Sequence, residues 1–338
     1  MTTPSPLGEG REGGKCGKGV EPNKKVLLMY SDQITELFSS QLQEWDLAKL
    51  NYSQLEKVRT RKLDFGKFDV FIQFNPERIR SSAAKVDAKS IGERPCFLCG
   101  KNRPPEQRGL VFDNRLTILV NPFPIFRRHL TIPSEFHTDQ RIRNNFDTML
   151  SLAEAMPSYT VFYNGPQCGA SAPDHFHFQA GNTGFMPVEN DFRNGKLTKL
   201  FSSEPGIEIL KWKAYLRGII TFKGSDRKKL VRVFDHLFER LSKTQPDRPE
   251  PMLNILAEHS HNEWIIHIIP RKQHRPTQFF SKGSDQILIS PAAVDLGGVI
   301  ITPREEDFNR INKSDIEDIF RQVCFEEGEL TSLLNEVL

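Results

Sequence analysis

The sequence lacks three features that would narrow its class at once. It has no apolar run long enough to span a bilayer, so no membrane segment is predicted. It has no strong excess of either charge: 46 basic and 43 acidic residues leave a net charge of +3, too small to indicate nucleic-acid or membrane binding. Its five cysteines are an odd number without a secretory signal, so we expect reduced thiols in a cytoplasmic protein.

The composition of the 338 residues is that of an ordinary globular protein, with 38% hydrophobic and 26% charged residues. The length suggests about two domains. The first residues, MTTPSPLGEGREGGKCGKGVEPNKK, are rich in Gly, Pro and Lys and have almost nothing to bury, so we expect a disordered tail over residues 1–28. Met29 directly precedes the first expected helix and is a candidate for the natural start.

The most informative stretch is NGPQCGASAPDHFHFQ, from Asn164 to Gln179. Its last five residues alternate, and successive side chains of a strand point to opposite faces. His175, His177 and Gln179 therefore share one face, while the phenylalanines between them enter a core. The glycines of the preceding loop, Gly169 among them, let a backbone approach a phosphate closely. This pattern indicates phosphoryl chemistry; the alternative is a buried strand whose histidines are only hydrogen-bonded.

Two similar successions of elements fill the rest of the chain. Apolar residues at helical spacing predict a first helix over residues 31–49, capped by Ser31, and alternation predicts a strand over 68–74. A strand, a strand, a helix and two strands then follow in each half. These segments are 116–120, 130–132, 138–156, 159–163 and 175–179, then 209–213, 218–222, 225–241, 252–257 and 264–269. His267 lies between isoleucines in the last strand, so no second motif is expected.

HFHFQ resembles the HxHxQ signature of the histidine-triad superfamily, in the branch of galactose-1-phosphate uridylyltransferase, diadenosine tetraphosphate phosphorylase and the GDP-hexose phosphorylases. Gly169-Ala170-Ser171 resembles the Gly-x-Ser of that branch, and HFHFQA is most similar to the GDP-hexose phosphorylases. The resemblance implies an α+β fold: an antiparallel sheet with helices, duplicated in one chain as a pseudo-dimer of two half-domains. We expect the catalytic half over residues 29–195 and a degenerate half over residues 196–338.

The resemblance also implies roles for single residues. His177 is the expected nucleophile, because a neutral imidazole can attack an α-phosphorus and form a nucleotidyl-histidine intermediate. Gln179 is expected to hold a non-bridging phosphate oxygen. Asn164, Gly169 and Ser171 match phosphate-binding positions.

Several positions leave alternatives open. Asp174 is an extra residue where the uridylyltransferase motif has none, which alters the register of the loop. Asn121 occupies a turn that often carries a ribose contact, but an Asn-Pro turn alone also explains it. Four basic residues either contact phosphate or belong to solvated turns: Arg78, Arg80, Arg271 and Lys272.

Cys96-Phe97-Leu98-Cys99 is a CxxC, and two cysteines with two histidines form a tetrahedral zinc set. Zinc-containing members of the superfamily use two cysteines, a histidine from the strand after the base-binding turn and the first motif histidine. Cys96, Cys99, His129 and His175 match that arrangement and predict a structural zinc, with His137 as the rival of His129. Redox use of the CxxC, or plain reduced cysteines, is the alternative.

Together these observations predict a nucleotidyltransferase of the phosphorylase type. It would cleave a nucleotide sugar, preferably a GDP-hexose, at the α-phosphate and transfer the nucleotidyl group to inorganic phosphate or a sugar phosphate. The alternatives are a diadenosine tetraphosphate phosphorylase or ATP adenylyltransferase, which takes a dinucleoside polyphosphate, and a non-catalytic zinc-stabilised nucleotide-binding module. No nucleic-acid or membrane partner is expected, and the protein is expected to be a monomer or a homodimer.

Overall fold

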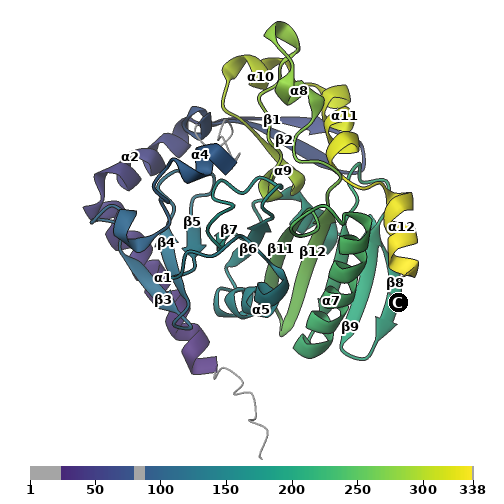
Figure 1. Ribbon diagram of the computed structural model, residues 1–338, viewed down its shortest axis with the longest axis horizontal. Helices are drawn as coiled ribbons and strands as arrows, with labels where there is room; N and C mark the ends of the chain where they lie inside the picture. The colour runs from purple at the N-terminus through teal and green to yellow at the C-terminus, as the bar shows by residue number, and fades with distance from the viewer. Residues whose placement is uncertain (1–23, 80–87, 337–338) are drawn as a thin grey trace, which may run out of the picture.

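The structure is a computed structural model that describes residues 24–79 and 88–336. Its centre is an antiparallel sheet of ten strands in the order β3-β4-β5-β7-β6-β11-β12-β10-β9-β8 (Figure 1). The α+β class and the large antiparallel sheet are thus confirmed. The strands are β3 (Gly109–Phe112), β4 (Leu116–Val120), β5 (His129–Pro133), β6 (Tyr159–Asn164), β7 (His177–Asn182), β8 (Thr198–Glu204), β9 (Ile207–Trp212), β10 (Ile220–Gly224), β11 (Leu253–Ser260) and β12 (Glu263–Pro270).

The order of the strands reveals the duplication. Read inward from either edge, the first half runs β3-β4-β5-β7-β6 and the second half runs β8-β9-β10-β12-β11. The halves join where β6 pairs with β11, and Phe162 faces Leu256 at the centre of this pairing. The same arrangement of five strands therefore occurs twice, as the predicted pseudo-dimer requires.

The strand registers show which positions of the second half correspond to the motif residues of the first half. His267 takes the place of Gln179, because each faces a threonine on the neighbouring strand, Thr221 and Thr131 respectively. Two residues before His267 on β12 stands Ile265, at the position that His177 occupies on β7. The second half thus has the strand but not the motif, as the sequence predicted.

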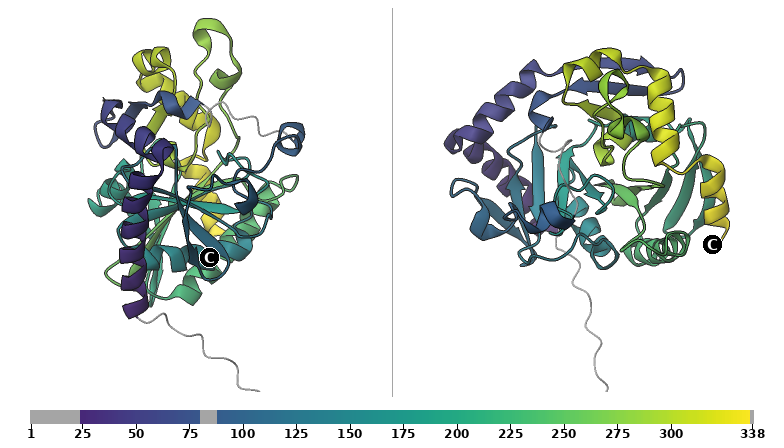
Figure 2. Two further views of the ribbon diagram at one scale, coloured as in Figure 1. Left: turned by 90° about the vertical axis from the view of Figure 1, so that its left-hand side faces the viewer. Right: turned by 45° about the horizontal axis from the view of Figure 1, so that its top comes forward.

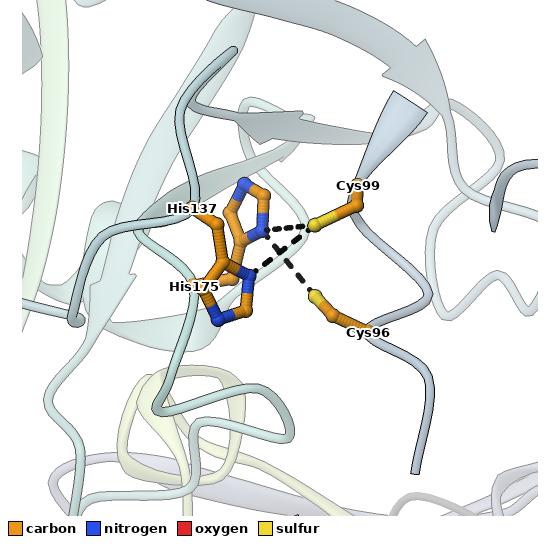
Figure 3. Close-up of side chains that lie close together, drawn as sticks. All are labelled: Cys96, Cys99, His137 and His175. Carbon is orange, nitrogen blue, oxygen red and sulfur yellow. Dashed lines mark hydrogen bonds between the residues drawn. The ribbon is translucent and has the colours of Figure 1, made fainter. Parts of the chain in front are cut away.

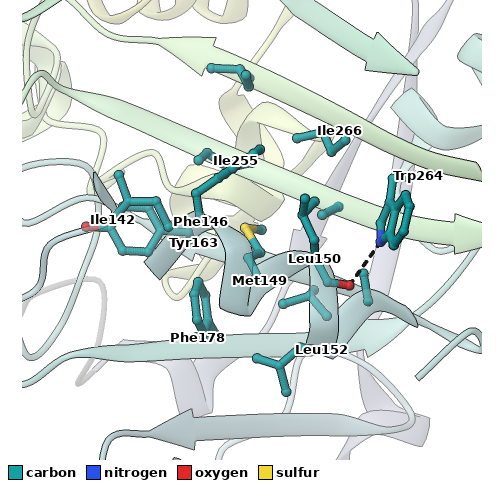
Figure 4. Packing of buried hydrophobic residues seen from close by; sticks show 14 of the residues in the cluster. Ile142, Phe146, Met149, Leu150, Leu152, Tyr163, Phe178, Ile255, Trp264 and Ile266 are labelled. Atoms are coloured by element: carbon teal, nitrogen blue, oxygen red, sulfur yellow. Dashed lines mark hydrogen bonds between the residues drawn. The ribbon is translucent and has the colours of Figure 1, made fainter. Parts of the chain in front are cut away.

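One face of the sheet packs against helices and forms the larger core. The phenylalanines of the motif, Phe176 and Phe178, both enter it. Phe178 lies beside Tyr163 (Figure 4). From the helices, Phe146 of α5 stacks on Phe234 of α7, with ring centroids 3.8 Å apart. The helices on this face are α1 (Lys24–Glu44), α5 (Phe146–Ala155), α7 (Arg227–Thr244) and α12 (Glu327–Asn335).

The opposite face, on which His177 and Gln179 lie, is partly covered by a second layer. This layer holds a three-stranded sheet of order β1-β2-β13 and the helices of the C-terminal third, which lie together at the top of Figure 1 and beside one another in both views of Figure 2. Its elements are β1 (Arg59–Asp64), β2 (Asp69–Phe74), β13 (Val299–Thr302), α9 (Ala293–Leu296), α10 (Glu305–Arg310) and α11 (Lys313–Val323). The segment predicted as a strand over 68–74 is confirmed as β2.

The first helix differs from the prediction. Helix α1 begins at Lys24, so the cap at Ser31 is wrong, and residues 24–28 of the expected tail belong to the helix. Residues 1–23 of that tail lie outside the described residues, as does Arg80. Trp45 adopts an extended backbone, with φ −115° and ψ 99°, and divides the expected helix into α1 and α2 (Asp46–Gln54).

The remaining helical segments are short connections. They are η1 (Leu55–Lys57), η2 (Pro76–Arg78), α4 (Ala88–Gly92), η3 (Gly100–Asn102), η4 (Arg143–Asn145), α6 (Pro187–Arg193), α8 (Thr277–Phe280) and η5 (Gly283–Asp285). Across the described residues, no helix combines the length and the apolar character needed to cross a membrane.

Candidate functional site

A cavity of about 510 Å³ lies over β7, within the size range of small-molecule sites. Both halves line it: His177 and Gln179 come from β7, the loop 169–171 precedes that strand, and residues 290–295 come from the second half. Its apolar lining includes Trp45, Leu47, Phe97, Leu98, Leu119, Pro122, Phe123 and Ile125. Three guanidinium groups also line it, those of Arg78, Arg94 and Arg275.

The ring of His177 is held in one tautomer. Its Nδ1 lies 2.8 Å from the carbonyl oxygen of His175, and because a carbonyl only accepts, Nδ1 carries the proton. Nε2 is left with its lone pair. Burial lowers the pKa of His177 from 6.5 to about 4, which favours the neutral ring. The carbonyl of His175 thus holds the proton on one ring nitrogen and leaves the other able to act as a lone-pair donor.

Gln140, which no sequence motif pointed to, fixes the backbone beneath that ring. Its Oε1 accepts from the amide of His177 at 2.8 Å. Its Nε2 donates to the carbonyls of His177 at 2.9 Å and of Asn164 at 3.0 Å. Gln140 is fully buried, so the start of β7 and the end of β6 are joined by one side chain that replaces ladder hydrogen bonds.

His129 belongs to this site and not to the metal cluster, which corrects the predicted ligand set. Its Nδ1 accepts from the amide of Ile125 at 3.2 Å, so Nε2 carries the proton and donates to Oε1 of Gln179 at 3.1 Å. Burial lowers the pKa of His129 to about 3, which keeps this tautomer neutral. Because Oε1 of Gln179 is engaged, the NH₂ end of the amide is the end left for a ligand in the cavity.

The loop before β7 is fixed by its glycines and by the second half. Gly169 has φ +93°, and a Cβ atom there would lie 2.5 Å from the Cβ of Ala292, so only glycine fits. Gly165 packs on Leu253, whose carbonyl oxygen would lie 2.9 Å from an added Cβ. Ser171 lines the cavity, and its carbonyl accepts from Arg94 at 2.9 Å.

Asn164 also lines the cavity, but its side chain serves the fold. Its Oδ1 accepts from the amide of Ala293 and from Nδ2 of Asn254, each at 2.8 Å. The other end of Asn254 accepts from Nη1 of Arg271 at 2.8 Å. Asn164 is thus a contact through which the second half holds the loop before β7.

Arg271 is neither a phosphate contact nor part of a solvated run. It is fully buried, and its guanidinium also donates to the carbonyls of Val323, Pro291, Gln273 and His274. These bonds hold the turn that brings His274 and Arg275 to the cavity. The sequence missed this because a charged residue after a strand looks like a surface residue.

Asn121 forms the turn that its sequence suggested. Its Oδ1 accepts from the amide of Phe123 at 2.9 Å, and its Nδ2 donates to Thr131 at 2.8 Å. Nη1 of Arg78 donates to the carbonyl of Phe123 at 2.9 Å, so Arg78 supports the same turn. Both residues line the cavity.

A second cluster lies beside the start of β7 and consists of Cys96, Cys99, His137 and His175 (Figure 3). Their ligand atoms all lie within 4.8 Å of one another. Nδ1 of His175 is 3.3 Å from Sγ of Cys96, and Nδ1 of His137 is 3.2 Å from Sγ of Cys99. The structure therefore selects the rival His137 in place of His129, and the four residues form a cluster that can hold a metal ion.

The hydrogen bonds around the cluster suit a metal. Nε2 of His175 donates to the carbonyl of Ser134 at 2.8 Å, which leaves the lone pair of Nδ1 toward the thiols. Nε2 of His137 lies 3.7 Å from Asp174, a carboxylate placed as in many metal-bound histidines. In tetrahedral zinc, bond lengths of about 2.3 Å to sulfur and about 2.05 Å to nitrogen separate the two ligand atoms by about 3.6 Å. The observed separations are close to this.

Comparison with known proteins gives matches along most of the chain. A domain of unknown function, DUF4922, matches residues 37–182, and the GDPGP1-like C-terminal domain matches residues 192–338. The structure resembles yeast Ap4A phosphorylase Apa2 in complex with Ap4A, with a TM-score of 0.59, 18% identity and coverage of 88% of this chain and 97% of Apa2. The C-terminal part of the chain thus matches the GDPGP1-like C-terminal domain, and the fold of the whole resembles that of Apa2.

Two further structures of Apa2 show the same likeness in fold. Without a named ligand, Apa2 gives a TM-score of 0.55 at 17% identity, over 88% of this chain and 94% of Apa2. In complex with AMP, it gives 0.51 at 18% identity, over 85% and 97%. At these identities the likeness concerns the fold, which is the predicted duplicated arrangement of two half-domains. No curated protein sequence matches the chain.

Proposed function

We propose that the protein is a nucleotidyltransferase of the phosphorylase type, with a GDP-hexose as its donor and inorganic phosphate as its acceptor. The observation that carries the proposal is the state of His177, a neutral buried imidazole with its proton committed to a carbonyl and its other nitrogen free. Its place in a cavity beside Gln179 supports the role of nucleophile. A non-catalytic module has no need of this arrangement.

The reaction would proceed in two transfers at one phosphorus. In the first, Nε2 of His177 bonds to the α-phosphorus while the bond to the bridging oxygen breaks, and the hexose 1-phosphate leaves. In the second, an oxygen of inorganic phosphate bonds to that phosphorus and the phosphorus–nitrogen bond breaks. The electron pair returns to Nε2 and a nucleoside diphosphate leaves. The carbonyl of His175 stabilises the positive charge that the ring carries between the two steps.

Gln179 supports transfer over hydrolysis. Its NH₂ group can hold a non-bridging oxygen of the phosphoryl group, but an amide cannot relay a proton to or from water. General acid–base assistance of that kind is worth about a hundred- to ten-thousand-fold. An acceptor that already carries negative charge needs less of it, so phosphate is favoured as the acceptor.

We further propose zinc as the ion of the cysteine–histidine cluster, because two thiols and two imidazoles suit zinc and leave no open position. Bound there, it would act structurally, holding residue 175 and with it the start of β7. We take the boundary between the catalytic and degenerate halves to lie between residues 195 and 196, just before β8.

The branch also contains phosphorylases of dinucleoside polyphosphates, and the structural likeness to yeast Ap4A phosphorylase Apa2 supports Ap4A as a second candidate donor. A panel of GDP-hexoses, other nucleotide sugars and dinucleoside polyphosphates, incubated with and without phosphate, distinguishes these donors when products are identified by mass. We expect phosphate-dependent release of GDP from a GDP-hexose.

Gln179→His tests the acceptor. The imidazole restores a proton relay, so the ratio of nucleoside monophosphate to nucleoside diphosphate at saturating phosphate should rise, while the total rate falls. His177→Ala is the inactive control. If the natural protein releases chiefly monophosphate under these conditions, it is a hydrolase and the phosphorylase proposal is wrong.

A further inference from the structure

Arg94 joins the two structures that surround the start of β7, the phosphate loop and the metal cluster. Its Nη2 donates to the carbonyl of Ser171 at 2.9 Å and lies 3.4 Å from Oδ1 of Asp174. Its guanidinium carbon lies 5.2 Å from the centre of the Phe97 ring, inside the CxxC segment. The side chain is 28% exposed and lines the cavity, so it has a fixed place and an open side.

Most donors of this guanidinium are unused. Nη2 makes both of the contacts just named, and Nε is buried without a partner. Among the described residues, Nη1 makes no hydrogen bond and is the donor left for a ligand. A planar group with spare donors beside a phosphate loop suits an anion with several oxygens. The other two cations of the cavity are placed elsewhere: Arg78 supports the turn at Phe123, and Arg275 donates to Ser290 of the second half.

We propose that Arg94 binds the inorganic phosphate that attacks the nucleotidyl-histidine, an inference that rests on the proposed function. The incoming phosphate and the phosphoryl group on His177 are both anions and repel each other. A guanidinium beside Ser171 offsets this repulsion at the acceptor and aligns an oxygen with the phosphorus. Water gains nothing from the same group, so Arg94 favours transfer over hydrolysis together with Gln179.

Asp174 holds Arg94 in place and links it to the metal ligands. One carboxylate oxygen lies 3.4 Å from Arg94 and the other lies 3.7 Å from Nε2 of His137. His137 in turn contacts Cys99 through Nδ1. Asp174, the residue that the uridylyltransferase motif lacks, thus acts as a positioning residue. Through it, the position of Arg94 in the phosphate subsite depends on the ordering of the metal cluster.

Binding of inorganic phosphate tests the inference without any turnover. The subsite is open in the free protein, so phosphate should raise the unfolding temperature of the natural protein in a saturable way. Arg94→Ala should weaken this binding by about ten- to a hundredfold, the range for loss of hydrogen bonds to a charged group. Arg94→Lys, which keeps the charge but not the fork, should fall between the two. Arg103→Ala is the matched control: Arg103 donates to Leu98 in the same segment but does not line the cavity.

Asp174→Asn tests the link. It should lower the affinity for phosphate several-fold and also speed the loss of zinc to a chelator, because second-shell carboxylates are worth about ten- to a hundredfold in metal affinity. In turnover assays with a competent donor, Arg94→Ala should raise the KM for phosphate more than the KM for the donor. A purely structural role would raise both alike.

Two results would overturn the inference: no saturable phosphate effect on the natural protein, or equal phosphate binding by Arg94→Ala. A different result would refute the proposed phosphorylase function while leaving this inference intact. If phosphate binding depends on Arg94 but no donor on the panel is consumed, the anion subsite stands and the phosphorylase activity does not.

Discussion

Replacing His129 by leucine tests whether that residue orients Gln179. Leucine removes two hydrogen bonds of the buried imidazole, the one accepted from Ile125 and the one donated to Gln179. The amide of Ile125 is then left buried without a partner, at about 1–3 kcal/mol, whereas Gln179 is only half-buried and faces the cavity. The expected loss of stability is therefore about 1–3 kcal/mol, which a fold of about 5–15 kcal/mol can survive.

Only the bond to Gln179 bears on the rate. Without His129, the amide can turn its oxygen toward the phosphoryl group, and the NH₂ end is no longer selected. A loss of about 1–3 kcal/mol in the transition state lowers kcat by about 5- to 150-fold. The same substitution at His267 is the matched control, because His267 is equally buried and occupies the Gln179 position of the second half.

The assay is the rate of GDP release at saturating donor and phosphate. It is carried out well below the melting temperature of each variant, and urea unfolding of each variant measures its stability. We expect a lower kcat for His129→Leu and an unchanged kcat for His267→Leu. A kcat equal to that of the natural protein in folded His129→Leu would refute the orienting role. Partial recovery in His129→Gln, which returns an N–H to Gln179, would support it.

Three further predictions follow from single residues. Purified protein should hold about one zinc per chain, and Cys99→Ser, unlike Cys324→Ser outside the cluster, should lose the metal and unfold at a lower temperature, as metal analysis and melting curves will show. His177→Ala should lower turnover by about a thousandfold or more while the protein stays folded, and imidazole should partly restore His177→Gly. Burial raises the pKa of Glu250 from 4.5 to about 7, so the folded protein keeps a proton that the unfolded chain loses. The free energy of unfolding should therefore fall as pH rises from about 4.5 to about 7, and Glu250→Gln should reduce that slope in urea titrations.

The motif was predictable because its information is local. Strict alternation places His177 and Gln179 on one face of β7, as predicted, but the expected strand over 175–179 begins only at His177, and His175 lies in the bend before it, in the metal cluster. The duplication was predictable because the same order of strands and helix occurs twice in the sequence. The lengths of the strand segments and the periodicity of the helical segments indicate that order. The helix start at Ser31 was wrong because a serine cap is a weak signal and α1 begins a full turn and more before it.

The metal set was predicted with one wrong member, and the reason is geometric. His129 and His137 are eight residues apart, and either could face the CxxC from the sequence alone. The pairing of β5 with β7 distinguishes the two histidines. His129 faces Gly181 near the end of β7, whereas His137 follows β5 and lies near the start of β7. Gln140, Asn254 and Arg271 were not predictable at all, since each acts through partners distant in the sequence.

The same long-range bonds explain why a half without the motif is still needed. The edge of β6 would lie open without β11, and an open strand edge exposes unpaired backbone groups. The loop before β7 would also lose Asn254 and Ala293, the two donors that hold the side chain of Asn164. Arg271 ties these partners to the turn that carries His274 and Arg275, which line the cavity. The second half therefore shapes the cavity over β7 even though its own strand has Ile265 where β7 has His177.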